Sequence, residues 1–272
     1  MKIHFPTSKP QLSLHKDEHV LWITLNHPET SNSITYEMIS SLTSTLHEAE
    51  LDIETRVVVL SGEGKNFCSG GDLQNMMNRE EMFHGESNEL RIRYEQGIQQ
   101  ISRSMEAFSK PIIAMVNGAA AGAGCDLACM CDLRIGTSES KFIESFVKLG
   151  LVPGDGGTFF LQRIVGYAKA LEMSLTGRAI QADEAEKIGL LNKIVDKSML
   201  KDETQKLARM IAQNAPIAVQ MTKRAMKVSY RHDLNVSLDL LAAYQGITQR
   251  THDHSESLNA MNEKRLPEYQ AK

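Results

Sequence analysis

Short apolar runs rich in β-branched residues recur along the first two thirds of the chain. They are bounded by turn residues such as Asn26, Gly62 and Gly136. Runs of this length between turn residues are typical of buried strands. The pattern therefore predicts strands at Val20–Leu25, Val57–Leu60, Ile112–Val116, Leu133–Ile135 and Lys193–Val195.

Helix-like stretches lie between these strands. Apolar residues recur with helical spacing at Tyr36–Glu50, Glu89–Phe108 and Cys125–Met130. Strands that alternate with helices favour an α/β fold whose central strands are buried and largely parallel.

The pattern changes from about Lys197, where helix-like segments follow one another with few strand candidates. Pro216 suits the first turn of one of them. The predicted helices are Met199–Gln213, Ile217–Tyr230, Leu234–Thr248 and Ser255–Asn262. We expect an α/β core over residues 1–196 and a helical region over residues 197–272 that helps to build an oligomer.

Composition excludes several classes of partner. The chain has 272 residues, 42% hydrophobic and 24% charged residues, and a formal net charge of −4. These proportions are ordinary for a globular protein, and the charge offers no reason to expect a nucleic acid partner. We find neither a signal-peptide pattern at the N-terminus nor an apolar run long enough to span a bilayer, so we expect no membrane insertion and a cytoplasmic location.

The four cysteines predict neither a disulfide framework nor a metal site. Three of them lie within seven positions, and no histidine lies near them. A zinc site would need paired cysteines or histidines at recognisable spacing. We interpret them as buried free thiols and expect no metal. The residues are Cys68, Cys125, Cys129 and Cys131.

Two strand-to-turn segments carry the clearest chemistry. After Ile112–Val116 the chain runs through Asn117-Gly118 and a series of small residues directly into a helix. The start of a helix offers unpaired N–H groups and a partial positive charge, which suit an anion. The segment lacks the third glycine of the dinucleotide fingerprint and the Gly-Lys-Ser/Thr of a phosphate loop. A small-residue helix packed tightly on a sheet is the alternative.

The second segment is the strand Val57–Leu60, which leads into the turn Ser61–Asp72. If each of the two turns supplies one N–H to the same oxygen, they form an oxyanion hole without a nucleophile. No Gly-x-Ser-x-Gly elbow is present, so the sequence offers no nucleophilic serine for serine-hydrolase chemistry.

These segments resemble motifs of the crotonase (enoyl-CoA hydratase/isomerase) superfamily. Lys65-Asn-Phe-Cys-Ser-Gly-Gly-Asp72 and Asn117-Gly-Ala-Ala-Ala-Gly-Ala-Gly-Cys-Asp126 are similar to its two oxyanion motifs, and Leu25-Asn-His-Pro-Glu-Thr-Ser-Asn32 is similar to its N-terminal loop. Later landmarks follow in order at Leu151–Thr158, Thr176–Arg178, Ala185 and Gly189–Leu190. The resemblance covers residues 20–196. It implies a spiral of ββα units with a C-terminal helical region that forms trimers or dimers of trimers.

The resemblance also implies roles for individual residues. The backbone N–H groups of Gly71 and Ala123 would form the oxyanion hole. Backbone around four further residues would border coenzyme A, which is part of the substrate, so no separate cofactor is expected. These residues are Thr30, Ser31, Cys68 and Gly70.

The acid–base residues depart from the usual pattern. Asp126 stands where a typical hydratase has Glu, one helical turn after Ala123, although a surface or capping Asp is the alternative. Phe146, which we assign to the substrate site, stands where the second catalytic Glu would be. Glu144 could replace this second catalytic Glu if it faces the same side of an extended segment as Phe146. The alternative is that Glu144 is an exposed carboxylate. Asp155 matches a catalytic position of the dienoyl-CoA isomerase branch, or caps the helix that begins near Thr158.

The resemblance favours an enzyme that stabilises a thioester enolate, with enoyl-CoA hydratase as the first interpretation. An enoyl- or dienoyl-CoA isomerase is the first alternative. An acyl-CoA decarboxylase or C–C lyase, and a non-catalytic acyl-CoA-binding protein, remain further alternatives. Both Asp126 and Asp155 would move protons in the leading interpretation.

Overall fold

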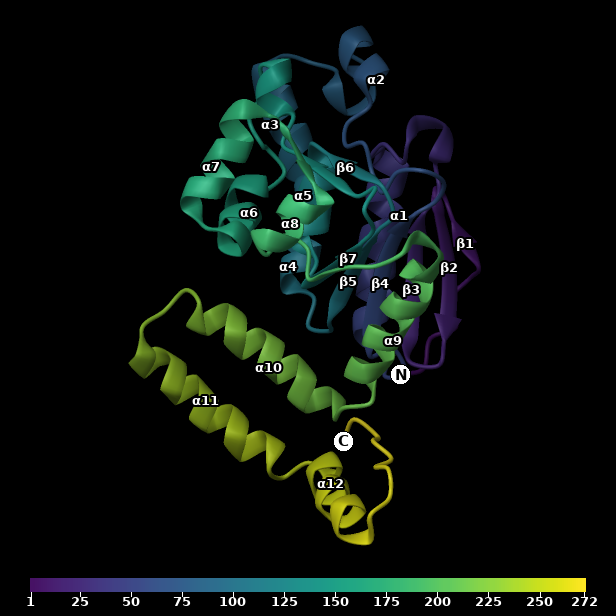
Figure 1. The fold of residues 1–272 in the computed structure, drawn as a ribbon, viewed down its shortest axis with the longest axis vertical. Helices are drawn as coiled ribbons and strands as arrows, with labels where there is room; N and C mark the ends of the chain where they lie inside the picture. Colours follow the sequence, from purple (N-terminus) through teal and green to yellow (C-terminus); the bar gives the residue numbers. More distant parts are fainter.

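A computed structural model describes residues 1–272 as an α/β body with a helical extension (Figure 1). A seven-stranded sheet has the order β1-β2-β3-β4-β5-β7-β10. The first three strands pair antiparallel, and the strands from β3 to β10 pair parallel, as predicted for the centre of the sheet. The strands are β1 Ser8–Lys9, β2 Leu12–Asp17, β3 Val20–Leu25, β4 Val57–Gly62, β5 Ile112–Val116, β7 Leu133–Gly136 and β10 Lys193–Ile194.

The continuous apolar run in β4 follows from burial on both faces of this sheet. Successive side chains on a strand point to opposite faces. Val58 and Leu60 join the main core with α1 (Tyr36–Leu51), whereas Val57 and Val59 pack in a smaller cluster with residues of α9 (Leu200–Ala212). The first helix of the C-terminal region therefore covers one face of the sheet.

A smaller sheet carries the residues around the candidate site. Its strands are β6 Ala119–Ala121, β8 Lys141–Ile143 and β9 Ala179–Gln181, in the order β6-β8-β9. An isolated bridge between Cys68 and Ala120 joins it to the turn that follows β4. The sequence pattern did not predict these three-residue strands.

The remaining helices of the body surround the two sheets. The predicted helix Glu89–Phe108 is divided at Gly97 into two, which is a correction to the sequence-based boundary. Glycine leaves the backbone free to adopt the non-helical angles found there, φ −104° and ψ −110°. The helices are α2 Leu73–Asn78, α3 Ser87–Gln96, α4 Gln99–Ala107, α5 Ala123–Met130, α6 Gly157–Val165, α7 Tyr167–Thr176 and α8 Ala182–Lys187.

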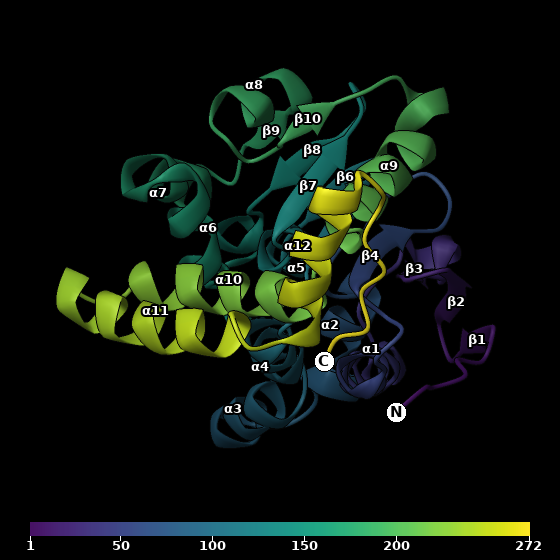
Figure 2. The same cartoon turned by 90° about the horizontal axis from the view of Figure 1, so that it is seen from below.

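The last three helices form a layer below the α/β body, and the first of them is joined to the body by the ion pair of Lys223 with Asp132 at 2.7 Å (Figures 1 and 2). They are α10 Pro216–Ser229, α11 Leu234–Thr248 and α12 His252–Glu263, and α10 packs along α11. Ser237 is the one buried residue of α11, while Leu234, Leu238 and Ile247 are each at least half exposed. No helix of the chain combines the length and apolar character needed to cross a membrane.

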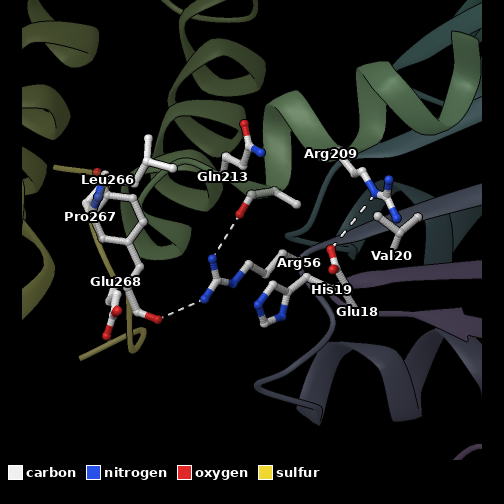
Figure 3. A pocket seen from close by; sticks show the side chains of 11 residues that line it. Glu18, His19, Val20, Arg56, Arg209, Gln213, Leu266, Pro267 and Glu268 are labelled. Carbon is white, nitrogen blue, oxygen red and sulfur yellow. Dashed lines mark hydrogen bonds and ion pairs between the residues drawn. The ribbon is translucent and has the colours of Figure 1, made fainter.

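The C-terminal segment returns to the body beside α9 (Figure 3). The Arg56 guanidinium donates to the backbone oxygens of Ala212 at 2.9 Å and Tyr269 at 2.8 Å. Asp253 accepts the backbone amides of Gln270 and Ala271. A cavity of about 390 Å³ lies between these parts, and none of the predicted site residues lines it.

Candidate active site

The two small-residue turns predicted to carry the chemistry meet at the start of α5. Ala121 N donates to Cys68 O at 3.0 Å. Gly70 has φ +85°, and a Cβ atom there would lie 2.9 Å from Ala123 N and 2.6 Å from Ala121 O. Glycine is required here both for the left-handed backbone and for the close approach of the two turns.

Gly71 and Ala123 line the same cavity. Gly71 N has no hydrogen-bond acceptor in the structure, although the neighbouring Gly70 O accepts from Ile34 N. Ala123 is the first residue of α5, so its N–H has no acceptor within its helix. Two free donors at one cavity, one of them at a helix N-terminus, suit an oxygen that gains negative charge.

This cavity has a volume of about 700 Å³ and a largely apolar wall. Among the residues predicted to contact the substrate, Thr30, Ser31 and Phe146 line it. Cys68 and Gly70 are buried beside the cavity and do not line it. The apolar wall comprises Leu73, Met76, Met77, Leu149 and Leu151, together with Phe146.

Asn32 holds the N-terminal loop in place, a role that sequence reasoning missed. It is fully buried at φ +58°, a conformation that Asn tolerates better than most residues. Its side-chain amide lies within hydrogen-bond distance of the backbone oxygens of Glu63, Asn66 and Phe67, and its Oδ1 accepts from His27 N. The loop bearing Thr30 and Ser31 is thereby fixed to the turn after β4.

Three carboxyl groups form a buried cluster near the first turn of α5. Asp126, Glu144 and Asp155 have exposed fractions of 0%, 1% and 2%. None of their six side-chain oxygens accepts a hydrogen bond from an amide, a hydroxyl group or a cation. They are not arranged to hold a metal ion. Buried carboxylates without donors or cations are costly, so protons must neutralise part of this charge.

Burial raises the pKa of Asp126 well above its usual range, and the neighbouring Asp155 and Glu144 raise it further. Burial also raises the pKa of Glu144 and of Asp155, while hydrogen bonding to Asp126 opposes both shifts. A protonated Asp126 would supply the cluster with a hydroxyl donor, beside the weakly donating Cys125 thiol. Burial and mutual proximity thus favour the protonated form in all three groups, and most strongly in Asp126.

Two sequence-based interpretations of these acids are corrected by the structure. Glu144 is not an exposed carboxylate, and it does not share a cavity with Phe146. Ser145 has helical angles and a 3-10 turn starts at Phe146, so the strand alternation that would align residues 144 and 146 is broken. Asp126 is neither a surface residue nor a cap, because it is fully buried inside α5.

The capping role considered for Asp155 is also wrong. The residue before α6 is Gly156, and no side chain caps this helix. The Asp155 side chain instead lies in the carboxyl cluster, while its backbone oxygen accepts from Ser102 Oγ. The predicted start of the helix near Thr158 is confirmed to within one residue.

Tyr94 of α3 is a neighbour of the cluster that the sequence did not indicate. A Cβ atom on Gly154 would lie 2.9 Å from Tyr94 Cε1, so the ring packs against the loop before Asp155. Burial raises the pKa of Tyr94, and the negative charge of Asp155 raises it further. No local pattern relates residues 94 and 155, since their contact depends on how α3 packs.

The carboxyl groups lie in the interior and do not line the cavity that contains the two free amides. The Phe146 ring occupies the cavity wall at this point, with Cζ 3.9 Å from the position that a Cβ on Gly122 would take. Asp126 is nevertheless only one helical turn from Ala123. The arrangement places the start of α5, with the free N–H group of Ala123, one helical turn from a buried carboxyl group.

Comparison with known proteins agrees with this architecture. The family model described as enoyl-CoA hydratase/isomerase matches residues 15–272. The chain is 35% identical to the 1,2-epoxyphenylacetyl-CoA isomerase of Escherichia coli, covering 95% of this chain and 97% of that protein. It is 35% identical to a short-chain-enoyl-CoA hydratase of Clostridium acetobutylicum, covering 93% and 94%.

A solved structure of similar fold is an enoyl-CoA hydratase from Bacillus anthracis. It superimposes with a TM-score of 0.89 at 31% identity and covers 96% of this chain and 100% of its own. The family model, the two relatives and this structure together confirm the fold and the predicted family. The chain belongs to the enoyl-CoA hydratase/isomerase family of the crotonase superfamily.

Proposed function

We propose that this enzyme hydrates 2-enoyl-CoA thioesters, with the thioester oxygen bound between the N–H groups of Gly71 and Ala123. The observation that carries the proposal is the presence of these two free donors on one cavity, one helical turn from the buried Asp126 carboxyl, whose pKa is raised by burial. Each such donor contributes about 3–4 kcal/mol when charge develops on the bound oxygen. Coenzyme A enters as part of the substrate, and Thr30 and Ser31 line the site.

In the proposed reaction, the oxygen of a water molecule bonds to the β-carbon and the water proton passes to the Asp155 carboxylate. The π electrons of the double bond move to the thioester oxygen, where the two amides stabilise the enolate. Asp126 then donates its proton to the α-carbon. Proton transfer from Asp155 to Asp126 restores the starting state. Bound substrate must first connect the cavity with the carboxyl cluster, past the Phe146 side chain.

Isomerisation of the double bond is the second candidate, and Phe146 favours it. An apolar ring occupies the cavity wall where a second carboxyl would help to hold water. Isomerisation needs one group to remove a proton and one to return it, and no water. The same amides and the same two aspartates would serve this reaction.

The test follows the conjugated-enone absorbance of crotonyl-CoA with the parent enzyme and with Asp126→Asn, while mass spectrometry detects added water. The proposal predicts loss of absorbance with a gain of one water, reduced about 10²–10⁴-fold in the variant while coenzyme A affinity is retained. A 3-enoyl-CoA converted without mass change, with crotonyl-CoA untouched, would support the isomerase instead. Binding without turnover of either substrate would contradict both candidates.

We also propose that the chain assembles as a trimer or a dimer of trimers through its C-terminal helices. Exposed apolar side chains on α10, α11 and α12 form a surface that a monomer would leave in water. The four cysteines are unpaired and buried, which supports a reducing compartment such as the cytoplasm.

A further inference from the structure

Glu144 is a buried acid that the proposed reaction does not use. It follows β8 directly, and β8 pairs parallel with β6. The backbone oxygen of the preceding Ile143 accepts from Gly122 N at 2.8 Å, immediately before Ala123. Glu144 is therefore tied through the backbone to the start of α5, where both Ala123 and Asp126 lie.

The Glu144 side chain faces Asp126 and, like Asp126 and Asp155, does not line the substrate cavity. It is 1% exposed, does not line the cavity, and has no hydrogen-bond donor from any amide, hydroxyl or cation. Its neighbours are the Asp126 carboxyl and the weakly donating Cys125 thiol. Asp126, in contrast, lies one helical turn from Ala123 at the cavity, so we assign the effect of Glu144 on the reaction to its contact with Asp126.

The geometry points to Glu144 as a positioning residue that keeps the transferable proton on Asp126. This inference rests on the proposed function, because it assigns Glu144 a part in the same site. A negative Glu144 beside Asp126 disfavours a second negative charge and accepts a hydrogen bond from the protonated form. Asp126 is thereby held as a proton donor, while Asp155 remains the group that accepts a proton from water.

The Lys148 side chain passes near the backbone oxygen of Glu144, beside Gly177, but forms no ion pair with any of the three carboxyls. The titratable groups that face the three carboxyls come from α3, α5 and the turn after β4, and none of them is a cation at neutral pH. They are Tyr94, Cys68, Cys125 and, next to Cys125, Cys129. Burial raises the pKa of the Cys68 thiol to about 12, so this group stays neutral.

The test replaces Glu144 by Gln and measures kcat/KM against pH. Gln keeps the shape of Glu and removes its charge, so Asp126 should lose its proton at lower pH. The basic limb of the kcat/KM profile should therefore move to lower pH, and kcat/KM at the alkaline end should fall about tenfold. Glu144→Asp restores a negative charge and should return the basic limb toward that of the parent. The control Glu37→Gln removes an exposed carboxylate from α1 and should leave the profile unchanged.

A second readout does not depend on turnover. Infrared absorption of protonated carboxyl groups, taken as the difference between each protein and its Asp126→Asn derivative, reports the titration of Asp126 directly. If Asp126 titrates at lower pH in Glu144→Gln but the parent enzyme turns over no enoyl-CoA, the proposed function is contradicted and the inference about Glu144 is kept. Identical Asp126 titrations in the parent and in Glu144→Gln would overturn the inference, whatever the activity.

Discussion

A Cβ atom on Gly157 would lie 2.0 Å from Oδ1 of Asp126, so the first turn of α6 packs directly on the carboxyl group of the proposed proton donor. Gly157 does not have a positive φ, and alanine could adopt its backbone conformation. The glycine is therefore required for space. This contact makes α6 the element that determines where the Asp126 carboxyl lies.

Gly157→Ala should displace the Asp126 carboxyl and reduce kcat by about 10²-fold, because small misplacements of reacting groups have large effects on rate. The overpacked site should also lower the free energy of unfolding by about 1–3 kcal/mol. Steady-state kinetics and urea unfolding check the two effects. Gly246→Ala is the matched control, since Gly246 also lies in a helix but has nothing within 4 Å. A Gly157→Ala enzyme with the parental kcat would show that packing of α6 does not fix the position of the Asp126 carboxyl.

Phe146→Glu should increase hydration of crotonyl-CoA. The substitution adds a carboxyl to the wall of the cavity beside Gly122, where it can hold a water molecule. We expect about a tenfold or greater rise in kcat/KM. Phe146→Gln is the control, because glutamine has nearly the shape of glutamate and is also polar but cannot accept a proton. Equal rates for the two variants would indicate that a second acid at this position adds nothing.

Asp52 should make the stability of the chain depend on pH in the acid range. It is fully buried and accepts hydrogen bonds from Lys16, Thr55 and the amide of Ile3. Burial alone would raise the pKa of Asp52, but these hydrogen bonds outweigh it and lower the pKa to about 2. Because the folded-state pKa lies below the unfolded value of 3.8, the stabilisation is complete above about pH 4 and is lost as pH falls toward 2.

The contribution amounts to about 2 kcal/mol of the free energy of unfolding. Asp52→Asn should be less stable than the parent at pH 7 by a similar amount, and this difference should shrink as pH falls. Urea unfolding between pH 3 and pH 7 measures it. A constant difference across that range would contradict the assignment.

Leu238→Glu combined with Leu241→Glu should dissociate the proposed trimer. The two residues lie one turn apart on α11 and are 51% and 42% exposed. Two carboxylates in an apolar interface lack partners and oppose association. Light scattering should give the mass of one 30.3 kDa chain for the variant. Leu51→Glu, which changes an exposed leucine of α1, should retain the parental mass; a monomeric parent would contradict the proposal.

The sequence by itself determined the strands and turns of the parallel sheet. A run such as Val57–Leu60 is apolar at every position because both of its faces are covered, and this pattern is readable without a structure. The two turns that bring Gly71 and Ala123 to one cavity were predictable for a related reason. Small residues after a strand and before a helix mark a close backbone approach, and their order along the chain identified the family.

Only the tertiary structure decided the state of the acids. Alternation along an extended segment suggested that Glu144 faces the same side as Phe146, but a turn at Ser145 directs them to different surroundings. The contact between Gly157 and Asp126 joins residues 31 positions apart on two helices. Periodicity indicates which face of an element is buried, but the partner of a buried carboxyl depends on how elements pack, and that partner determines whether it holds a proton.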